Sequence, residues 1–479
     1  MSTETYLWHD YETFGRDASR ERPVQFAAIR TNAALEEIDE RTMIYCRQTP
    51  DYLPDPESCI VHGVLPQTAN ENGLSEWEFA TKIHSLMALP GTCTLGYNNI
   101  RFDDEFSRQL FFRNLFDPYA REWKNGNSRW DLIDIVRLTR ALRPEGIEWP
   151  VDSEGHPTNK LELITDANGI SHSDAHDALA DVFATIEVAR LIKQKQPRLY
   201  DYALSARSKR FIQQSLNTIN KPAALHVSGM YPATLGHLSI VMPLGPHPTN
   251  TNGILVYDLR VDPTDLITLP KEAIAERVFT RQADLPEGCH RIAVKTVHSN
   301  KCPVVAPLKT LTKENAERLQ LDINQAMTYR EQLLANPQVL EKLAWAFASR
   351  DFPNADDPDL TLYSGKFASS RDKNLMDNIQ TLLTQGKPLP DNMPFEDQRL
   401  NELLFRLQAR HQPEQLSEQE KIRWRQFCHN RVHKGNEGFR TIADYENALI
   451  QLEASEKSKN YPDMINQLRN YGNQVAAFS

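Results

Sequence analysis

Cysteine is scarce in this sequence: six occur in 479 residues, and no two of them form a C-x-x-C pair. Small secreted proteins that depend on disulfides are far richer in cysteine, and zinc sites typically use closely spaced cysteine pairs. The pattern therefore indicates neither a disulfide framework nor a zinc site. We expect reduced, mostly buried side chains at Cys46, Cys59, Cys93, Cys289, Cys302 and Cys428.

Long apolar runs are also missing. No stretch approaches the ~20 residues that cross a bilayer, and the N-terminus lacks the basic-then-apolar pattern of a secretory signal. A P-loop is missing as well, because "SGKFAS" has Leu360 where that motif needs its first glycine. We therefore expect a cytoplasmic protein and consider a P-loop ATPase or helicase unlikely on this motif.

Positive charge is in deficit, because 54 Lys and Arg stand against 64 Asp and Glu, a formal net charge of −10. Phosphate binding needs basic residues, so this average argues mildly against a nucleic-acid partner. Residues 187–221 depart from this average charge. They contain eight basic residues and two acidic ones, which gives a local charge of +6. A solvated helix face would explain this segment equally well. The basic residues are Arg190, Lys193, Lys195, Arg198, Arg207, Lys209, Arg210 and Lys221.

The chain is too long for a single hydrophobic core. Over residues 5–195 predicted strands alternate with amphipathic helices, which is typical of an α/β layer fold. Over 222–305 short apolar runs alternate with Gly, Pro and Asn turns, as in a small β-barrel or sandwich, and a helical segment follows at 313–347. After 350–360, which we interpret as a linker, the periodicity is helical again. We predict three domains, over residues 1–196, 197–350 and 351–479.

Local signals place several elements within these regions. Ser followed three residues later by Glu is the capping box that opens a helix, and it predicts helix starts at Ser75 and Ser417. Apolar residues at helical spacing predict an amphipathic helix over 130–142. The expected strands of the first region include 5–14, 24–31 and 91–98.

Two carboxylates, Asp10 and Glu12, stand one residue apart in "LWHDYETFG". Residues i and i+2 of a strand point to the same face, so these two side chains should converge. Converging carboxylates repel, and one takes up a proton unless a cation lies between them. Mg²⁺ and Mn²⁺ prefer oxygen ligands of this kind. The alternative is a solvated strand edge.

A histidine and further acids follow later in the same region. "HDALAD" places His176 just before a helix that Asp177 caps, and Asp181 lies beside small residues that leave room for a ligand. The alternative is a surface histidine and a first-turn acid favoured by the helix dipole. Asp103 lies at a predicted loop-to-helix junction, where it could be an N-cap. Asp104 competes for that role, which would leave Asp103 available for another.

In chain order these residues form a strand D-x-E, a central F-D and an H-x-x-x-x-D. Four acids and one histidine in one α/β region suit two-metal phosphoryl hydrolysis. Two cations about 4 Å apart activate a water and stabilise the leaving oxygen, while a neutral histidine takes the water's proton.

The same segments resemble the DEDD exonucleases of the histidine subclass, and within them the bacterial exonuclease I family. The likeness is carried by "HDYETFG", "QFAAIRT", "LGYNN", "RFDDE", "LRPEGI" and "AHDA", and it continues through "LHVSGM" and "NKCPV". It is strong over roughly residues 5–350 and weaker over the helical tail. Trp8 is a small departure, since the family often has Phe there.

This resemblance implies a ribonuclease H-like DEDD exonuclease domain, an SH3-like barrel and a C-terminal helical domain, together a C-shaped clamp around the strand. It implies a processive 3′→5′ exodeoxyribonuclease of DNA repair and recombination that releases 5′-mononucleotides from single-stranded DNA. Two Mg²⁺ ions, replaceable by Mn²⁺, are the implied cofactors. A monomer is the default for a clamp built from one chain.

Roles carry over by position. The resemblance implies metal ligation by Asp10, Glu12 and Asp181, a fourth acid at Asp103 for the second metal, and His176 as general base. Substrate contacts are expected at Glu12, Arg108, Tyr119, Trp123, Arg137, Lys160, Lys209 and Lys301. Lys160 replaces a family arginine, which keeps the charge but loses the bidentate fork. The acidic tail of the single-stranded-DNA-binding protein is expected at Arg143 and Tyr202.

Two other functions remain possible at this stage. One is a DEDD exoribonuclease that trims RNA 3′ ends, although such chains are usually only as long as the first region. The other is a catalytically silent scaffold that binds single-stranded DNA. The complete set of four acids and a histidine counts against a silent site, because a binding module has no use for carboxylates that face a phosphate.

Overall fold

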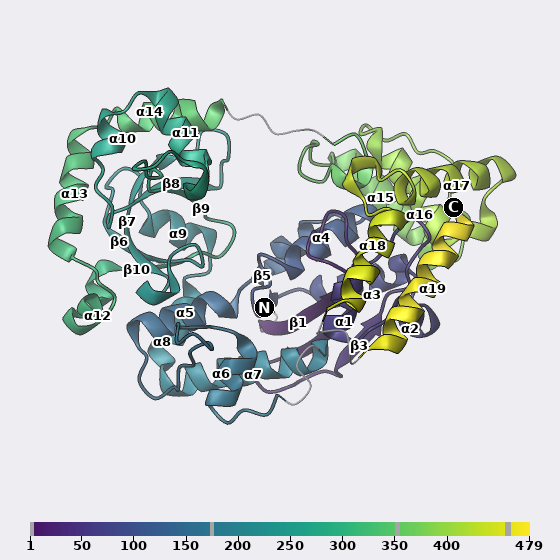
Figure 1. Ribbon diagram of the computed structural model, residues 1–479, viewed down its shortest axis with the longest axis horizontal. Coiled ribbons are helices and arrows are strands. Elements are labelled where there is room, and N and C mark those ends of the chain that lie inside the picture. The colour runs from purple at the N-terminus through teal and green to yellow at the C-terminus, as the bar shows by residue number, and fades with distance from the viewer. Residues whose placement is uncertain (1–3, 173–176, 350–354, 456–460) are drawn as a thin grey trace. The chain divides into compact units, whose positions relative to one another are not determined.

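The computed structural model describes residues 4–172, 177–349, 355–455 and 461–479 (Figure 1). The chain divides into two compact units. The first comprises residues 1–128, 172–186 and 353–479, and the second comprises 129–171 and 187–352. The first unit thus combines most of the predicted first domain with the predicted third. Within the described residues, no helix is long and apolar enough to cross a membrane.

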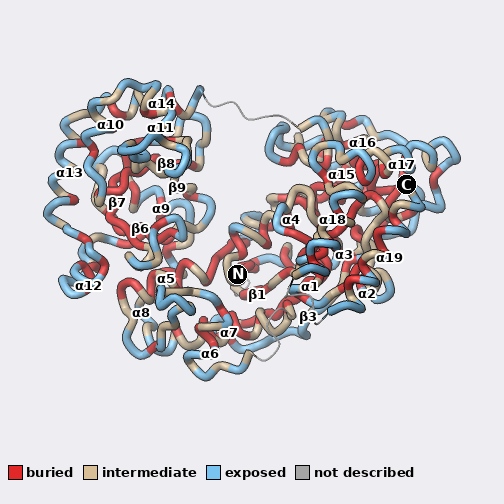
Figure 2. The backbone as a smooth tube through the Cα atoms, viewed as in Figure 1, coloured by how far each residue is buried: buried red, intermediate tan, exposed pale blue. Residues whose placement is uncertain are grey.

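A five-stranded sheet forms the frame of the first region, in the order β3-β2-β1-β4-β5. The central strand β1 is antiparallel to β2 and parallel to β4, and every residue of β2 is buried. Figure 2 colours the backbone by burial. The strands predicted at 5–14, 24–31 and 91–98 are confirmed as β1 (Thr5–Thr13), β2 (Pro23–Thr31) and β4 (Thr92–Leu95). The sheet also contains β3 (Thr42–Tyr45) and β5 (Ser128–Arg129), which were not predicted.

Helices cover this sheet and form a core with it. Leu7 and Tyr11 of β1 point away from Asp10 and Glu12 and pack among residues of α3 and α4. The predicted capping box of Ser75 and Glu78 opens α3. The helices of this region are α1 (Pro56–His62), α2 (Pro66–Asn72), α3 (Glu76–Met87), α4 (Asp103–Arg113) and α7 (Ala178–Lys195), the last of which continues into the second unit.

The C-terminal helices share hydrophobic cores with the first region. Leu403 and Leu404 of α16 pack in the same cluster as Leu7 of β1, and Leu449 of α18 packs with Phe14, just after β1. The Ser417 capping box is confirmed at the start of α17. These helices are α15 (Ser370–Thr384), α16 (Arg399–His411), α17 (Glu418–Val432), α18 (Ile442–Glu453) and α19 (Pro462–Phe478).

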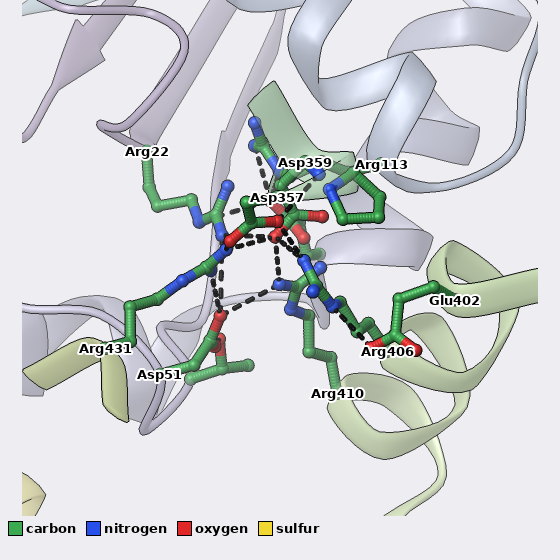
Figure 3. Close-up of polar contacts among 12 residues, drawn as sticks. Arg22, Asp51, Arg113, Asp357, Asp359, Glu402, Arg406, Arg410 and Arg431 are labelled. Atoms are coloured by element: carbon green, nitrogen blue, oxygen red, sulfur yellow. Dashed lines mark hydrogen bonds and ion pairs between the residues drawn. The ribbon is translucent and has the colours of Figure 1, made fainter. Parts of the chain in front are cut away.

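A buried ionic cluster joins these two parts of the first unit (Figure 3). The Asp359 carboxylate accepts from Arg410 at 2.7 Å and from Arg431 at 2.8 Å. Asp51, from the first region, accepts from the same two arginines at 2.9 Å each. Burial alone would raise the pKa of Asp359, but Arg410, Arg406 and Arg431 outweigh it and hold the pKa well below its usual range. Asp359 therefore stays charged at neutral pH.

The interpretation of residues 350–360 as a linker is wrong for its second half. Residues 350–354 lie outside the described part of the chain. Pro358–Leu360 form a 3₁₀ turn, and Asp359 is fully buried in the ionic cluster. A polar, acidic stretch is typical of solvated chain, but here arginines from distant helices neutralise it. No local pattern in the sequence identifies those arginines as partners.

A second five-stranded sheet, in the order β10-β6-β7-β8-β9 with all pairs antiparallel, organises the second unit. This confirms the predicted β-rich region. Its core contains Val241, Val256 and Val305. The strands are β6 (Ala224–Val227), β7 (Leu238–Pro246), β8 (Gly253–Asp258), β9 (Val294–His298) and β10 (Val304–Pro307).

The second unit also contains helices, of which α5, α9 and α13 contact the sheet. The amphipathic helix predicted at 130–142 is present as α5 (Leu132–Leu142). The helical segment expected after the barrel consists of α12 (Lys313–Arg318), α13 (Ile323–Ala335) and α14 (Val339–Ala348). The others are α6 (Leu161–Ala167), α8 (Pro197–Ser205), α9 (Lys209–Ser215), α10 (Thr264–Thr268) and α11 (Lys271–Phe279).

Candidate active site

Three carboxylates converge at the end of β1. Asp10 and Glu12 lie on one face of the strand, and Asp181 reaches them from the first turn of α7. One ligand oxygen from each of the three lies within 4.8 Å of the others, and all three residues are half-buried. A group of oxygens this close could hold a divalent cation.

The electrostatics of the three acids fit a cation. Burial, followed by the charges of Asp103, Glu12 and Asp181, raises the pKa of Asp10 well above its usual range. Burial and the charges of Asp181, Asp103 and Asp177 raise the pKa of Glu12 to about 9. Carboxylates that repel each other in a desolvated site are stabilised in their charged form by a metal ion between them. The donor set therefore suits a hard divalent metal.

Asp103 lies close enough to influence both acids of β1, although it is not one of the three converging ligands. It is the first residue of α4, and its Oδ1 accepts a hydrogen bond from the backbone N–H of Tyr11 at 3.1 Å. This bond ties the start of α4 to β1, between Asp10 and Glu12. The fourth acid is thus held against the strand that carries the first two.

The expectation that Asp104 competes for the N-cap is wrong. Phe102 occupies that position, and Asp104 instead pairs with Arg121 at 2.7 Å, with both side chains fully buried. Asp104 is therefore committed to a structural ion pair behind the site. The partner comes from a turn seventeen residues later, which no local pattern identifies.

The residues before α7 include one histidine that the sequence did not single out. His176 lies outside the described residues. Asp177 is in place as predicted, with its Oδ1 accepting from the N–H of Leu179 at 3.0 Å. His172 Nε2 lies 2.7 Å from Asp181 Oδ1. Neither spacing nor periodicity marked this contact, because a segment without regular structure brings His172 to the helix.

Gln25 is a second residue that sequence reasoning missed. It is buried, and it stands opposite Glu12 in the β1–β2 register. Its Oε1 accepts from the backbone N–H of Ala178 at 3.4 Å, and its Nε2 donates to Tyr45 Oη at 3.2 Å. Gln25 thereby links the sheet to the start of α7, which carries Asp181. A glutamine inside an apolar strand was the available signal.

Two of the basic residues expected at the substrate are engaged within the protein. Arg108 is only 4% exposed and pairs with Glu122 and Glu105 at 2.7 Å each. Its guanidinium is therefore already paired within the protein, and its expected phosphate contact stays a prediction. Arg137 pairs with Asp134 at 2.6 Å and is 13% exposed.

The other expected substrate residues are more accessible. Trp123 is 65% exposed, and Lys160 and Lys301 are exposed. Lys209 is also exposed and donates to Asn252 Oδ1 at 2.6 Å. Tyr119 is half-buried and makes a T-shaped contact with Phe367, with ring centroids 5.5 Å apart.

The two residues expected to bind a protein tail both lie in the second unit. The Arg143 guanidinium reaches the carbonyl of Thr310 at 3.4 Å from each Nη. Tyr202 Oη donates to the carbonyl of Val305 at 2.8 Å. Both side chains are half-buried.

Comparison with known proteins identifies the family. Three family profiles match in order, described as exonuclease over residues 7–189, exonuclease I SH3-like domain over 207–349 and exonuclease I C-terminal domain over 356–475. Exodeoxyribonuclease I of Escherichia coli strain K12 is 43% identical over 457 residues, which is 95% of each chain.

Solved structures agree with these profiles. Exonuclease I from Methylocaldum szegediense matches with a TM-score of 0.92 and 46% identity, over 98% of this chain and 99% of that one. Escherichia coli exonuclease I in complex with a dA16 oligonucleotide matches with a TM-score of 0.93 and 40% identity, over 98% and 100%.

The fold and the converging carboxylates define a metal-dependent exonuclease. More narrowly, the chain belongs to the exonuclease I family of exodeoxyribonucleases. The predicted order of an exonuclease domain, an SH3-like domain and a C-terminal domain is confirmed.

Proposed function

We propose that the chain degrades single-stranded DNA processively from the 3′ end and releases 5′-mononucleotides by two-metal-ion hydrolysis. The observation that carries this is the convergence of Asp10, Glu12 and Asp181 to within 4.8 Å. Solved relatives support the substrate, because Escherichia coli exonuclease I has been crystallised with dA16 and dT13 oligonucleotides.

Asp10, Glu12 and Asp181 would hold the catalytic metal, and Asp103 would act on a second ion directly or through water. We take Mg²⁺ as the ion, with Mn²⁺ able to replace it; a zinc-bound form of the Escherichia coli enzyme with single-stranded DNA supports a divalent site. Bound metal lowers the pKa of its water and neutralises charge on the phosphate. His176 is proposed to take the proton from the attacking water.

Contacts with the DNA strand are proposed for the expected residues that are accessible. Exposed Trp123 and half-buried Tyr119 would stack bases, which is sequence-tolerant because every base has a π-face. Lys160, Lys209 and Lys301 would contact phosphates. Arg137 would contact a phosphate only if its guanidinium binds the phosphate and Asp134 together.

A protein partner is also proposed. A solved complex of single-stranded-DNA-binding protein with exonuclease I, bound to an inhibitor, supports such a partner for this chain. Its acidic tail would meet the Arg143 guanidinium, with Tyr202 as the second proposed contact. Arginine suits this role because its fork binds carboxylates bidentately.

We extend the proposal to a monomeric, cytoplasmic enzyme of DNA repair and recombination. The three metal ligands come from one chain, and six cysteines that form no disulfide suit a reducing compartment. The proposed domains are residues 1–196, 197–350 and 351–479, and each family-profile match falls inside one of these ranges.

The test is the product ladder from a 5′-labelled single-stranded oligonucleotide, run with Mg²⁺ and with EDTA. We expect shortening from the 3′ end with Mg²⁺ and none with EDTA. Asp10→Ala should abolish it, while Asp391→Ala, at an exposed acid in the C-terminal region, should not.

Three results would contradict the proposal. Equal digestion of RNA would favour the RNA-trimming alternative, and binding without cleavage would favour the silent scaffold. Digestion of a strand blocked at its 3′ end would contradict the polarity.

A further inference from the structure

His172 contacts the carboxylate of Asp181. Its Nε2 lies 2.7 Å from Asp181 Oδ1, and its own side chain is only 5% exposed. Asp181 is 23% exposed and sits in the first turn of α7. A short contact in a largely desolvated position is stronger than the same contact in water.

The backbone of Asp181 is fixed independently of this contact. Its N–H bonds the carbonyl of Asp177 at 3.0 Å, and its own carbonyl accepts from Thr185 Oγ1 at 2.8 Å. Gln25 holds the neighbouring N–H of Ala178. These bonds place the Cα of Asp181 and do not involve its carboxylate. His172 acts on the carboxylate itself, through the contact with Oδ1.

We propose that His172 is a positioning residue for the metal ligand Asp181. An ionised carboxylate only accepts hydrogen bonds, so His172 contributes a donated Nε2–H. A carboxylate has two oxygens, and one can accept from His172 while the other ligates the metal. Carboxylate ligands in metal sites are commonly held by such hydrogen bonds, and losing one costs about 10–100-fold in metal affinity or activity.

This role deepens the proposed function and rests on it, because it assumes that Asp181 binds a divalent ion. It differs from the role proposed for His176. His176 would take a proton from the attacking water, whereas His172 keeps its own proton and donates it in a hydrogen bond to the carboxylate. A positioning role changes how tightly the site holds metal, and a proton-transfer role changes the rate once metal is bound.

The test is a titration of the full chain with Mn²⁺ in the absence of DNA. Electron paramagnetic resonance measures the concentration of free Mn²⁺ at each step. For His172→Ala we expect the dissociation constant of the more tightly bound Mn²⁺ ion to rise about tenfold. His172→Gln offers a donor at a similar reach and should restore most of the affinity. The rate at saturating Mn²⁺ should stay close to wild type in both variants.

His156→Ala is the matched control. His156 is an exposed imidazole beside two carboxylates, those of Asp152 and Glu154, in the second unit. Its removal deletes the same kind of histidine–acid pair without touching the three ligands, so Mn²⁺ binding should not change. Circular dichroism and the melting temperature would show whether each variant is folded, and His172→Gln keeps the test available if His172→Ala is not.

Three outcomes would overturn the proposal. Unchanged Mn²⁺ affinity in His172→Ala would mean that the contact does not position the ligand, and tighter binding would mean that His172 competes with the metal. A lowered rate at saturating Mn²⁺ with unchanged affinity would assign His172 to proton transfer. Absence of Mn²⁺ binding by the wild-type chain would instead refute the proposed function itself.

Discussion

Asp359→Asn tests the ionic cluster that joins the C-terminal helices to the exonuclease region. In the wild-type chain, Asp359 is fully buried within reach of three guanidinium groups, those of Arg410, Arg431 and Arg406, at 2.7, 2.8 and 3.2 Å. The ion pairs of this cluster join six arginines to five acids: Arg22, Arg113, Arg406, Arg410, Arg423 and Arg431 to Asp51, Glu76, Asp357, Asp359 and Glu402. Asparagine preserves the shape and removes one of the negative charges that compensate these guanidinium groups.

The size of the effect follows from burial. Removing one partner from a buried ion pair costs about 3–5 kcal/mol, because the remaining charge stays desolvated. Since every 1.4 kcal/mol is about a tenfold change in an equilibrium constant, local opening of the C-terminal helices should become at least about a hundredfold more frequent. Asp391→Asn, at an exposed acid of the same region, should change stability by less than about 0.5 kcal/mol.

Hydrogen exchange in peptides from α16 and α17 measures this opening directly. The neighbouring arginines hold the pKa of Asp359 below its unfolded value of about 4. The stabilisation is therefore complete above pH 4 and is lost as the pH falls through the lower folded-state pKa, so the difference between wild type and variant should narrow only in acid. Equal exchange in both proteins at pH 7 would refute the reasoning.

Three further predictions concern the site and the strand. Lys160→Ala should raise KM for single-stranded DNA more than it lowers kcat, and Lys160→Arg should lower KM because arginine adds a bidentate fork; equal KM values in all three proteins would contradict this. Trp123→Ala should weaken oligonucleotide binding, measured in EDTA, by about 1–3 kcal/mol, and Arg108→Ala should lower the melting temperature. Burial and the neighbouring acids raise the pKa of Glu12 to about 9 and that of Asp10 well above its usual range, so metal binding should release protons below pH 9. Without metal, proton binding to these two acids stabilises the folded chain at low pH, and this stabilisation is lost as the pH rises toward 9. Mg²⁺ should therefore raise the melting temperature more at pH 8.5 than at pH 6. A pH-independent Mn²⁺ affinity would contradict this.

Local patterns in the sequence predicted what depends on neighbours along the chain. The helix at 130–142 follows from apolar spacing, and the helix starts at Ser75 and Ser417 follow from a side chain that bonds a backbone N–H three residues later. The convergence of Asp10 and Glu12 follows from the two-residue repeat of a strand. Each of these needs no knowledge of the tertiary structure.

Contacts between distant segments could not be predicted in this way. Asp104 pairs with Arg121, and Asp359 pairs with two helices that begin about forty and about sixty residues later in the chain. His172 reaches Asp181 from a segment without a regular repeat. In each case the partner is chosen by the tertiary fold, so a charged residue that looks solvated in the sequence proves to be buried and paired.

The central claim is that Asp10 and Glu12 stand side by side because a divalent ion lies between them and Asp181. Anomalous diffraction from crystals of this chain soaked in Mn²⁺ measures that directly. The account predicts a peak with carboxylate oxygens of all three residues at about 2.1 Å, the distance expected for a small divalent ion. A peak elsewhere, with none among these three carboxylates, would contradict it.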